Sequence, residues 1–573
     1  MGGKKISPEK EQSKNNKSNI ALIKELLKPH KTIRMAVHKD IMVTHLETTI
    51  MDTLVFQRLR RLKQLGLTNL VFPSANHTRF EHSLGVLHVA DKIVNKINKN
   101  PYGTFLIDDE DLFIIRLCGL IHDLGNLPFG HTIEDEGGLF GPQWSDERFT
   151  YFLGDNSEIG KIILNYPALK KSFSNLKKNR LNPANVLNEL IETLKNIELG
   201  TPEKLERPYI ADIVGNTLCA DLLEYSKRDP YFTGLELTYD ERILSYLYLG
   251  NYHKKKRLVL RLIKPKTKEI RRDILSELMD LLRLRYSLAE KVYYHHTKAI
   301  ASAMLISSVN ALVQEGKLSS EQLFQMDDEI LLNFLSSSGN KTSMNLVNSL
   351  RKRKLYKIVY DLTYSEMGIA KTEALKKSDL IQQLRDPKNR RKKEQTLERM
   401  NSSSTTILDK PGSIIIYCPS QKMGKKELET LVDWGKEISP LKDIGDKRIQ
   451  GEIKTSITDK HEELWRMYVL VDSEISDIDR THINGDCEEL FGLASASEKY
   501  KVANHTDYID RHADKWHREN PDAPELLWTE VEEIKIRVPT RGDAPGETIS
   551  YDDFCINLTN LRTPEVDGKK EIE

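Results

Sequence analysis

Three short segments, far apart in the chain, combine histidine with acidic residues. His82 lies in the first, His122 and Asp123 are adjacent in the second, and Asp221 opens the third. Two imidazoles and two carboxylates form a mixed nitrogen and oxygen ligand set, which suits a divalent transition metal with open positions for water and substrate. A thiolate-rich set would instead indicate structural zinc. A metal held here could polarise a phosphoryl oxygen and lower the pKa of a bound water, which could then attack phosphorus.

Each segment taken alone has a simpler interpretation. A single histidine in a helical pattern is more often a hydrogen-bonded core or surface residue than a metal ligand. An adjacent His-Asp pair also occurs by chance. The combination of the segments, together with the residues around each one, favours a metal site.

Long helices are the elements that must position these residues. Apolar residues recur three and four apart from residue 20 to about residue 380, which predicts a mainly α core. One such series contains Leu84, Leu87, Ala90, Val94 and Ile97. A second series runs from Leu112 to Ile121, and we expect its helix to end at Gly125.

Shifts in composition along the chain predict its domain organisation. The expected regions are a disordered tail at 1–19, a helical catalytic core at 20–385, a basic and serine-rich linker at 386–410, a small α/β regulatory or oligomerisation region at 411–535, and a polar segment at 536–573. Within the α/β region, residues 413–418 and 465–471 are expected to be strands and residues 425–438 an amphipathic helix.

The overall composition restricts the class of protein. Lys and Arg total 86 against 85 Asp and Glu, so net charge indicates no partner class. The five cysteines are scattered and never form a CxxC pair, which is typical of a reducing compartment. No apolar run is long enough to span a bilayer. We therefore expect a cytoplasmic protein that does not enter membranes.

The same segments, in the same order, resemble the HD superfamily. The resemblance is greater to its deoxynucleoside triphosphate triphosphohydrolase branch, which includes bacterial dGTPases and the animal sterile-alpha-motif and HD-domain enzymes. The motifs that carry it are Asp52-Thr53, 56–60 (FQRLR), Gln64-Leu65-Gly66, 71–73 (VFP), 78–86 (TRFEHSLGV), 122–131 (HDLGNLPFGH), 221–229 and, more loosely, 285–295. Together they span about residues 40 to 300.

The resemblance implies an activity and the residues that perform it. His82, His122, Asp123 and Asp221 would bind one divalent metal (Mn, Mg, Fe or Zn), and deoxynucleoside triphosphates would be hydrolysed to deoxynucleoside and triphosphate. A leaving oxygen needs a proton, and the catalytic pair His131 and Glu134 would supply it. In the simpler alternative, His131 caps a loop and Glu134 faces solvent.

Substrate contacts follow from spacing and from the resemblance. Asp221, Tyr225 and Asp229 are four residues apart, so on one helix they share a face. The positions that match family contacts to the base, sugar or phosphates are Gln64, Leu65, Arg79, Tyr225, Asp229, Arg285 and Tyr293. For Tyr225 and Leu65, ordinary core packing is an equal alternative.

Two departures from the family pattern remove positive charge near the substrate phosphates. Asp146 stands where the family usually has a phosphate-contacting His, and Leu222 replaces a Lys. A carboxylate beside a triphosphate repels it unless the carboxylate is protonated or metal-bound. The affinity for a triphosphate is therefore in doubt, whereas the four metal ligands are unchanged. Asn126, where the animal enzymes carry a second His, is shared with the enterobacterial dGTPase motif.

Regulation by a nucleotide is a further implication of the resemblance. Asp52, Gln57 and Arg60 match an activating guanine-nucleotide site between subunits, although the preceding loop is shorter here. The alternative is that Arg58 and Arg60 form ion pairs on a helix surface. The resemblance also implies a homo-oligomer, commonly a tetramer or hexamer.

Other classes of function remain open. Basic clusters at 254–257, 351–354 and 390–393 lack interleaved aromatic residues, so a solvated surface is favoured over nucleic-acid binding. A non-catalytic nucleotide sensor would keep the pocket and bind without turnover. A phosphodiesterase or nuclease would need a basic track along an open groove. Nucleotide-pool balance and antiviral defence by nucleotide depletion are two biological settings for the hydrolase.

Overall fold

A computed structural model describes residues 21–103, 105–139, 144–172, 180–267, 269–363, 374–401, 411–419, 429–454 and 464–496, with two short strands at 527–529 and 535–537. The chain divides into two compact units. The first comprises Met1–Leu355, Leu375–Arg390 and Cys418–Arg466, and the second Tyr356–Ala374, Arg391–Tyr417 and Met467–Glu573. The described residues are mainly helical with a few small sheets, which confirms the predicted fold class.

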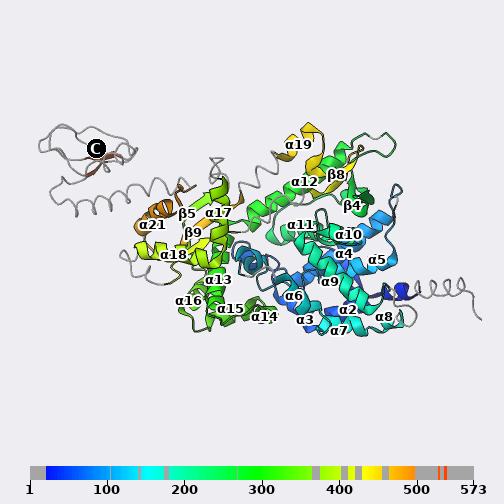
Figure 1. The fold of residues 1–573 in the computed structure, drawn as a ribbon, viewed down its shortest axis with the longest axis horizontal. Coiled ribbons are helices and arrows are strands. Elements are labelled where there is room, and N and C mark those ends of the chain that lie inside the picture. The colour runs from blue at the N-terminus through cyan, green and yellow to red at the C-terminus, as the bar shows by residue number, and fades with distance from the viewer. Residues whose placement is uncertain are drawn as a thin grey trace, which may run out of the picture. The chain divides into compact units, whose positions relative to one another are not determined.

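The first unit contains most of the helices (Figure 1). Its α-helices are α2 (His45–Met51), α3 (Leu54–Gln57), α4 (Arg79–Asn98), α5 (Asp109–Ile121), α6 (Trp144–Leu153), α7 (Glu158–Asn165), α8 (Pro167–Ser172), α9 (Pro183–Leu199), α10 (Pro208–Gly215), α11 (Ala220–Thr233), α12 (Arg272–Leu288), α13 (His296–Gln314), α14 (Ser320–Gln325), α15 (Asp328–Ser336), α16 (Lys341–Arg351), α17 (Ala374–Arg385) and α19 (Lys447–Ile453). Its shorter turns are η1 (Arg58–Arg61), η2 (Gly66–Leu70), η3 (Thr132–Glu136), η4 (Pro202–Lys204), η5 (Glu241–Tyr246), η6 (Ala289–Tyr293) and η9 (Leu441–Asp443).

The helix α4 lies at the centre of this unit and packs against α5, α10 and α11 (Figure 1). Gly119 of α5 permits the close approach to α4, because a Cβ there would lie 3.2 Å from the Cα of Leu87. The helix α5 ends at Ile121, with His122 as its C-cap, so the predicted end at Gly125 is wrong. The chain leaves the helix directly at the His-Asp pair, and Gly125 lies in the following turn.

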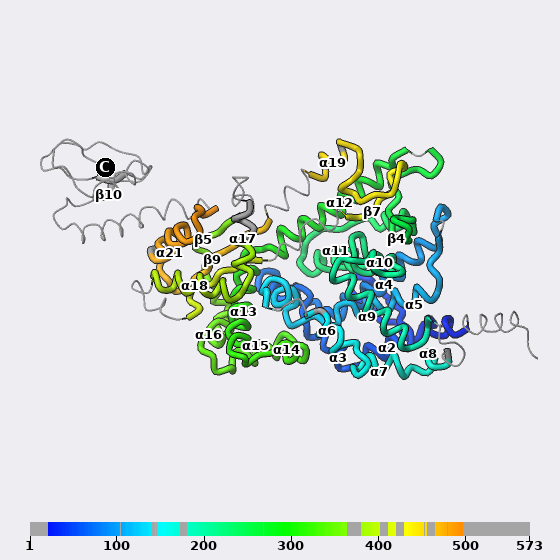
Figure 2. Tube along the Cα trace, viewed as in Figure 1, coloured from blue at the N-terminus to red at the C-terminus, as the bar shows by residue number. Residues whose placement is uncertain are grey.

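Two small sheets complete the first unit. The strands β1 (Pro29–Met35) and β2 (Lys39–Thr44) form a hairpin. The strands β3 (Leu247–Tyr252), β4 (Lys255–Arg261), β7 (Leu431–Asp433) and β8 (Ile438–Pro440) form a sheet in that order, with β4 and β7 parallel. The tube view shows β7, in yellow, near β4 (Figure 2). The predicted helix over 425–438 is therefore wrong in its described part. Pairing with β4, which is distant in sequence, overrides the local amphipathic pattern.

The second unit is built on a three-stranded sheet. The strands β5 (Lys357–Thr363), β9 (Arg466–Val471) and β6 (Ile414–Tyr417) lie in that order. The helices α18 (Pro387–Asn401) and α21 (Asp477–Phe491) and the short pair β10 (Leu527–Thr529) and β11 (Lys535–Arg537) are the other described elements. The strands predicted at 413–418 and 465–471 are confirmed.

The segment predicted as a linker, 386–410, contains α18 over Pro387–Asn401. Its basic residues fold because they are paired: Arg391 forms ion pairs with Glu394 and Glu398, and Leu397 is fully buried. The predicted tail at 1–19 and nearly all of 536–573 lie outside the described residues. No helix in the described part of the chain is long and apolar enough to cross a membrane.

Candidate metal centre and nucleotide pocket

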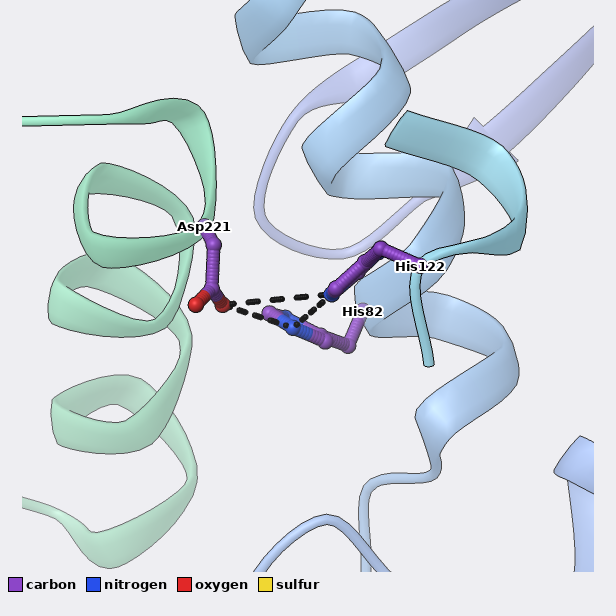
Figure 3. Close-up of side chains that lie close together, drawn as sticks. All are labelled: His82, His122 and Asp221. Atoms are coloured by element: carbon purple, nitrogen blue, oxygen red, sulfur yellow. Dashed lines mark hydrogen bonds and ion pairs between the residues drawn. The ribbon is translucent and has the colours of Figure 1, made fainter. Parts of the chain in front are cut away.

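Three helix ends bring the predicted metal ligands together. His82 lies in the first turn of α4, His122 directly follows α5, and Asp221 lies in the first turn of α11. The His82 and His122 Nε2 atoms are 3.2 Å apart, and the Asp221 Oδ1 is 3.1 Å from the first and 4.0 Å from the second (Figure 3). These three side chains could hold one metal ion. Residues 139 positions apart in sequence thus converge at a single point.

A contact at Nδ1 fixes the orientation of each imidazole ring. His82 Nδ1 lies 2.5 Å from a carboxylate oxygen of Glu224, and His122 Nδ1 lies 2.9 Å from the carbonyl oxygen of Gly119. Both oxygens accept hydrogen bonds, so both Nδ1 atoms donate, and each ring turns its Nε2 toward the other. Two Nε2 atoms 3.2 Å apart can share a proton, or each can give a lone pair to one metal ion. This donor set fits a divalent metal.

The charges around the centre also favour a bound cation. Burial opposes a charge on His82, but the carboxylates of Glu224, Asp221 and Asp123 raise its pKa to about 10. Burial likewise opposes ionisation of Asp221 and Asp123. Nevertheless, His82 beside Asp221 and His122 beside Asp123 hold the pKa of both carboxyl groups below their usual range. The site is therefore anionic at neutral pH apart from its histidines.

The fourth predicted ligand, Asp123, lies beside the other three. Its Oδ1 is 3.5 Å from His122 Nε2, and its Oδ2 is 3.7 Å from His82 Nε2. The same Oδ2 accepts a hydrogen bond from Arg79 Nη1 at 2.6 Å. Asp123 Oδ1, which Arg79 does not contact, is therefore the oxygen that could bind a metal while the Arg79 contact is kept.

Comparison with known proteins agrees with this geometry. The family model described as "HD domain" matches residues 79–190, and the model described as "HD associated region" matches residues 279–501. The chain is an HD-domain protein. The predicted resemblance is confirmed, and the first match begins at Arg79, in the turn that carries His82.

Several relatives are similar to this chain at 27–33% identity. An uncharacterised protein of Methanocaldococcus jannaschii is 33% identical over 59% of this chain and 61% of its own length. The "Deoxynucleoside triphosphate triphosphohydrolase SAMHD1 homolog" of Dictyostelium discoideum is 27% identical over 59% of this chain and 62% of its length. The human protein named "Deoxynucleoside triphosphate triphosphohydrolase SAMHD1" is 27% identical over 60% and 58%. The chain thus spans about 60% of the length of these relatives.

The fold is shared with a solved structure. A hypothetical protein from Aquifex aeolicus, 21% identical, superposes with a TM-score of 0.51 over 79% of this chain and 99% of its own. This likeness concerns the fold alone.

The two residues of the predicted catalytic pair, His131 and Glu134, contact other groups and not each other in the described contacts. His131 is mostly exposed, and its Nδ1 lies 2.9 Å from Asp135 Oδ2. Glu134 is turned inward, where it accepts a hydrogen bond from the Leu127 amide at 2.5 Å. The alternative in which Glu134 faces solvent is therefore wrong. Asp135, which sequence reasoning passed over, is the carboxylate that His131 contacts.

The wall of the predicted nucleoside pocket contains a hydrogen-bonded triad. One oxygen of Asp229 lies 2.9 Å from His77 Nε2, and the other accepts from the Tyr293 hydroxyl at 2.6 Å. The Tyr225 and Tyr293 rings meet edge to face at 6.4 Å. Burial raises the pKa of both tyrosines, and the nearby Arg285 guanidinium partly offsets the rise. Tyr225 and Asp229 lie four residues apart on α11, and both contact Tyr293 of η6.

Gln64 and Leu65 lie in the loop before η2, next to this wall. The side-chain oxygen of Gln64 is buried and has no hydrogen-bond partner among the described residues. An unpaired buried acceptor costs about 1–3 kcal/mol, which a ligand donor would recover. Leu65 is only half-buried, so it is not an ordinary core residue.

The two departures from the family pattern have different surroundings. Asp146 is exposed, and its Oδ1 lies 2.6 Å from the Lys195 ammonium. Leu222 is buried in the core, facing away from solvent. The negative charge of Asp146 is thus partly neutralised within the protein, while the lost Lys at position 222 has no replacement on α11 at that point.

The residues of the predicted activating site lie close together around η1. Arg60 Nε donates to Gln57 Oε1 at 2.8 Å, and its guanidinium lies 3.5 Å above the Phe80 ring. Asp52 is the exposed C-cap of α2. The alternative of an Arg58 ion pair on the surface is wrong, because Arg58 is buried and donates to backbone carbonyls.

The basic clusters are largely occupied by intramolecular contacts. Lys255 donates to two backbone carbonyls and Arg257 pairs with buried Asp212. Arg353 donates to Leu70 O, and Arg390 is buried. These contacts support a structural role over nucleic-acid binding.

Several supporting residues were missed in the sequence. Glu224 contacts the predicted ligand His82, and His77 contacts the predicted Asp229. His38 and Arg228 contact Glu224 in turn. Glu224 and Arg228 could have been found, because they lie three and seven residues after Asp221 on the same helix. His38 and His77 carry no comparable local signal.

We expect His88, beside this site on α4, to make stability sensitive to acid. Burial, nearby His38 and, more weakly, Lys92 lower its pKa to about 4, against the opposing effects of Asp91 and Glu241. Because the folded pKa lies below the unfolded value, the stabilisation is complete above about pH 6.5 and is lost as pH falls toward 4. Between pH 7 and pH 4.5, the free energy of unfolding of His88→Gln should fall by about 1–2 kcal/mol less than that of the unaltered protein, after allowance for partial exposure. Urea unfolding at pH 7 and pH 4.5 tests this, and parallel losses in both proteins would contradict it.

Proposed function

We propose that this HD-domain protein is a metal-dependent hydrolase that converts deoxynucleoside triphosphates to deoxynucleoside and triphosphate. The observation that carries the proposal is the convergence of the His82 and His122 Nε2 atoms with the Asp221 carboxylate, on the same helix as Tyr225 and Asp229. The names of the Dictyostelium and human relatives support the same reaction. A nucleotide placed along this wall would present its phosphates to the metal ligands.

The proposed ligands are His82, His122, Asp123 and Asp221. A divalent ion held by them would supply Lewis acidity to a phosphoryl oxygen and would acidify a water. Arg79, buried beside Asp123, contributes positive charge where the phosphates would lie. Its Nε is buried without a hydrogen-bond partner among the described residues, so it retains a donor for an anionic ligand.

His131 is the proposed source of the proton for the leaving oxygen. Its imidazole is exposed to the solvent side, and Asp135 accepts a hydrogen bond from Nδ1, which leaves Nε2 for proton exchange. Asp229, held by His77 and Tyr293, would accept a hydrogen bond from a sugar hydroxyl. The unpaired Gln64 oxygen would accept one from the nucleoside.

Product analysis tests the proposal directly. The protein with Mn²⁺ or Mg²⁺ would receive each dNTP and NTP, singly and in mixtures, beside an Asp123→Ala control. We expect deoxynucleoside and triphosphate in equal amounts, absent in the control. Faster turnover in mixtures would identify an activating nucleotide.

Each other result would overturn the proposal in a distinct way. Nucleotide binding without release of triphosphate from any mixture would indicate a nucleotide sensor. Release from oligonucleotides alone would indicate a nuclease.

A further inference from the structure

A fully buried carboxylate lies directly behind the metal centre. Glu224, on α11, has no exposed surface and contacts three basic side chains. His82 Nδ1 lies 2.5 Å from its Oε2, His38 Nε2 lies 3.1 Å from its Oε1, and Arg228 Nε donates to Oε1 at 2.7 Å. Burial opposes its charge, but Arg228 and His82 hold the pKa of Glu224 well below its usual range.

The two oxygens of Glu224 have different partners. Oε1 serves His38 and Arg228, whereas Oε2 contacts His82. The contact at Nδ1 leaves Nε2 as the atom of His82 that faces His122 and Asp221, where the metal would lie. A carboxylate behind a ligating imidazole fixes ring orientation and raises its basicity as a ligand.

The neighbouring helix leaves room for this carboxylate. Gly85 lies one turn after His82 on α4, and a Cβ at that position would lie 2.1 Å from Glu224 Oε1. Any larger residue would displace the carboxylate. Arg228 lies four residues after Glu224 on α11. A carboxylate at position 224 could therefore pair with Arg228 without packing against α4.

His38 connects a distant element to the same carboxylate. It lies in the turn between β1 and β2, 186 residues from Glu224 in sequence, and its side chain is 6% exposed. Its contact is with Oε1, whereas His82 contacts the other oxygen, Oε2. His38 and Glu224 therefore connect the β1–β2 hairpin to His82 through two polar contacts.

We propose that Glu224 is the positioning residue that fixes His82 for metal binding, and that His38 of the β1–β2 turn holds Glu224 in place. Metal affinity then depends on the hairpin as well as on the four ligands. The inference rests on the proposed metal centre.

The test uses the full chain and Co²⁺ alone as the probe, followed by titration calorimetry and by the visible absorption of the bound ion. Glu224→Asp keeps the charge that Arg228 needs but withdraws the oxygen from His82. We expect it to weaken Co²⁺ binding about 10–100-fold and to change the absorption spectrum. His38→Gln should weaken binding about 3–10-fold.

His88→Gln is the matched control. His88 lies near His38, with ring centroids 5.3 Å apart, but makes no contact with Glu224 in the described contacts, so Co²⁺ binding should be unchanged. Thermal melting of the metal-free proteins separates folding from positioning. If Glu224→Asp fails to fold, His38→Gln, which leaves the Glu224–Arg228 pair intact, decides the result.

Equal Co²⁺ affinity and spectrum in Glu224→Asp, His38→Gln and the control would overturn the inference and leave Glu224 as the partner of Arg228 alone. Failure of the unaltered protein to bind Co²⁺ would instead overturn the proposed metal centre, and the inference with it.

Discussion

Asp221→Asn is expected to remove metal binding and triphosphate release together. The substitution keeps the size of the side chain but removes the anionic oxygen that lies 3.1 Å from His82 Nε2 and 4.0 Å from His122 Nε2. Hydrolysis should fall at least about 10³-fold, because the ligand set loses a charge as well as a donor. Coupled assays of triphosphate release and Mn²⁺ titration calorimetry measure the two effects.

Unfolding experiments distinguish lost chemistry from lost folding. At about 100 times its dissociation constant, Mn²⁺ should stabilise the unaltered protein by about 2.7 kcal/mol. It should not stabilise Asp221→Asn, and the metal-free variant should be less stable than the unaltered protein, because it loses the ion pair between Asp221 and His82. Asp280→Asn, at an exposed position on α12, is the control and should keep both activity and Mn²⁺ stabilisation. Equal stabilisation of all three proteins by Mn²⁺ would exclude Asp221 as a ligand.

The candidate metal ligands could be identified in the sequence because each lies in a motif whose neighbours are also informative. The turn at Arg79 and His82 matches the start of the HD domain, and the His122-Asp123 pair follows a strongly apolar helix. The spacing of Asp221, Tyr225 and Asp229 correctly placed three side chains on one face of α11. In these cases a local pattern is sufficient, since helix geometry fixes which side chains share a face.

Other parts of the site depend on contacts between distant segments. The His38 contact with Glu224 joins residues 186 positions apart, and no local period indicates it. Likewise, β7 forms because it pairs with β4, so an amphipathic pattern alone predicted a helix there. The preference of His131 for Asp135 over Glu134 depends on the π-helical turn η3, which changes which side chains lie on one face.

Arg58 shows most clearly how burial reverses an interpretation made from sequence. In the stretch Gln57–Arg60, Arg58 and Arg60 have similar sequence surroundings, and both are readily interpreted as surface cations. In the structure Arg58 is buried and donates to the carbonyl oxygens of Met326, Leu124 and Asn126, at 3.0, 3.1 and 2.8 Å. Burial lowers its pKa to about 10, still high enough for it to remain charged. Arg58 therefore braces the turn that follows the His122-Asp123 pair.

Arg58→Met is accordingly expected to destabilise the fold by about 3–5 kcal/mol, because three carbonyls would lose a charged donor in a buried place. The loss should appear as a lower urea midpoint with an unchanged slope. Arg60→Met, two residues away, is the matched control: its side chain is exposed, so it should cost less than about 1 kcal/mol.

Together, Arg58→Met and Arg60→Met distinguish a structural role from a regulatory one. If Arg60 contributes to an activating nucleotide site, Arg60→Met should remove the stimulation seen in nucleotide mixtures while its urea midpoint stays near that of the unaltered protein. Arg58→Met should lower the midpoint whether or not nucleotide is present. Equal midpoints for Arg58→Met and Arg60→Met would show that the three carbonyls find other donors, and the bracing role of Arg58 would be wrong.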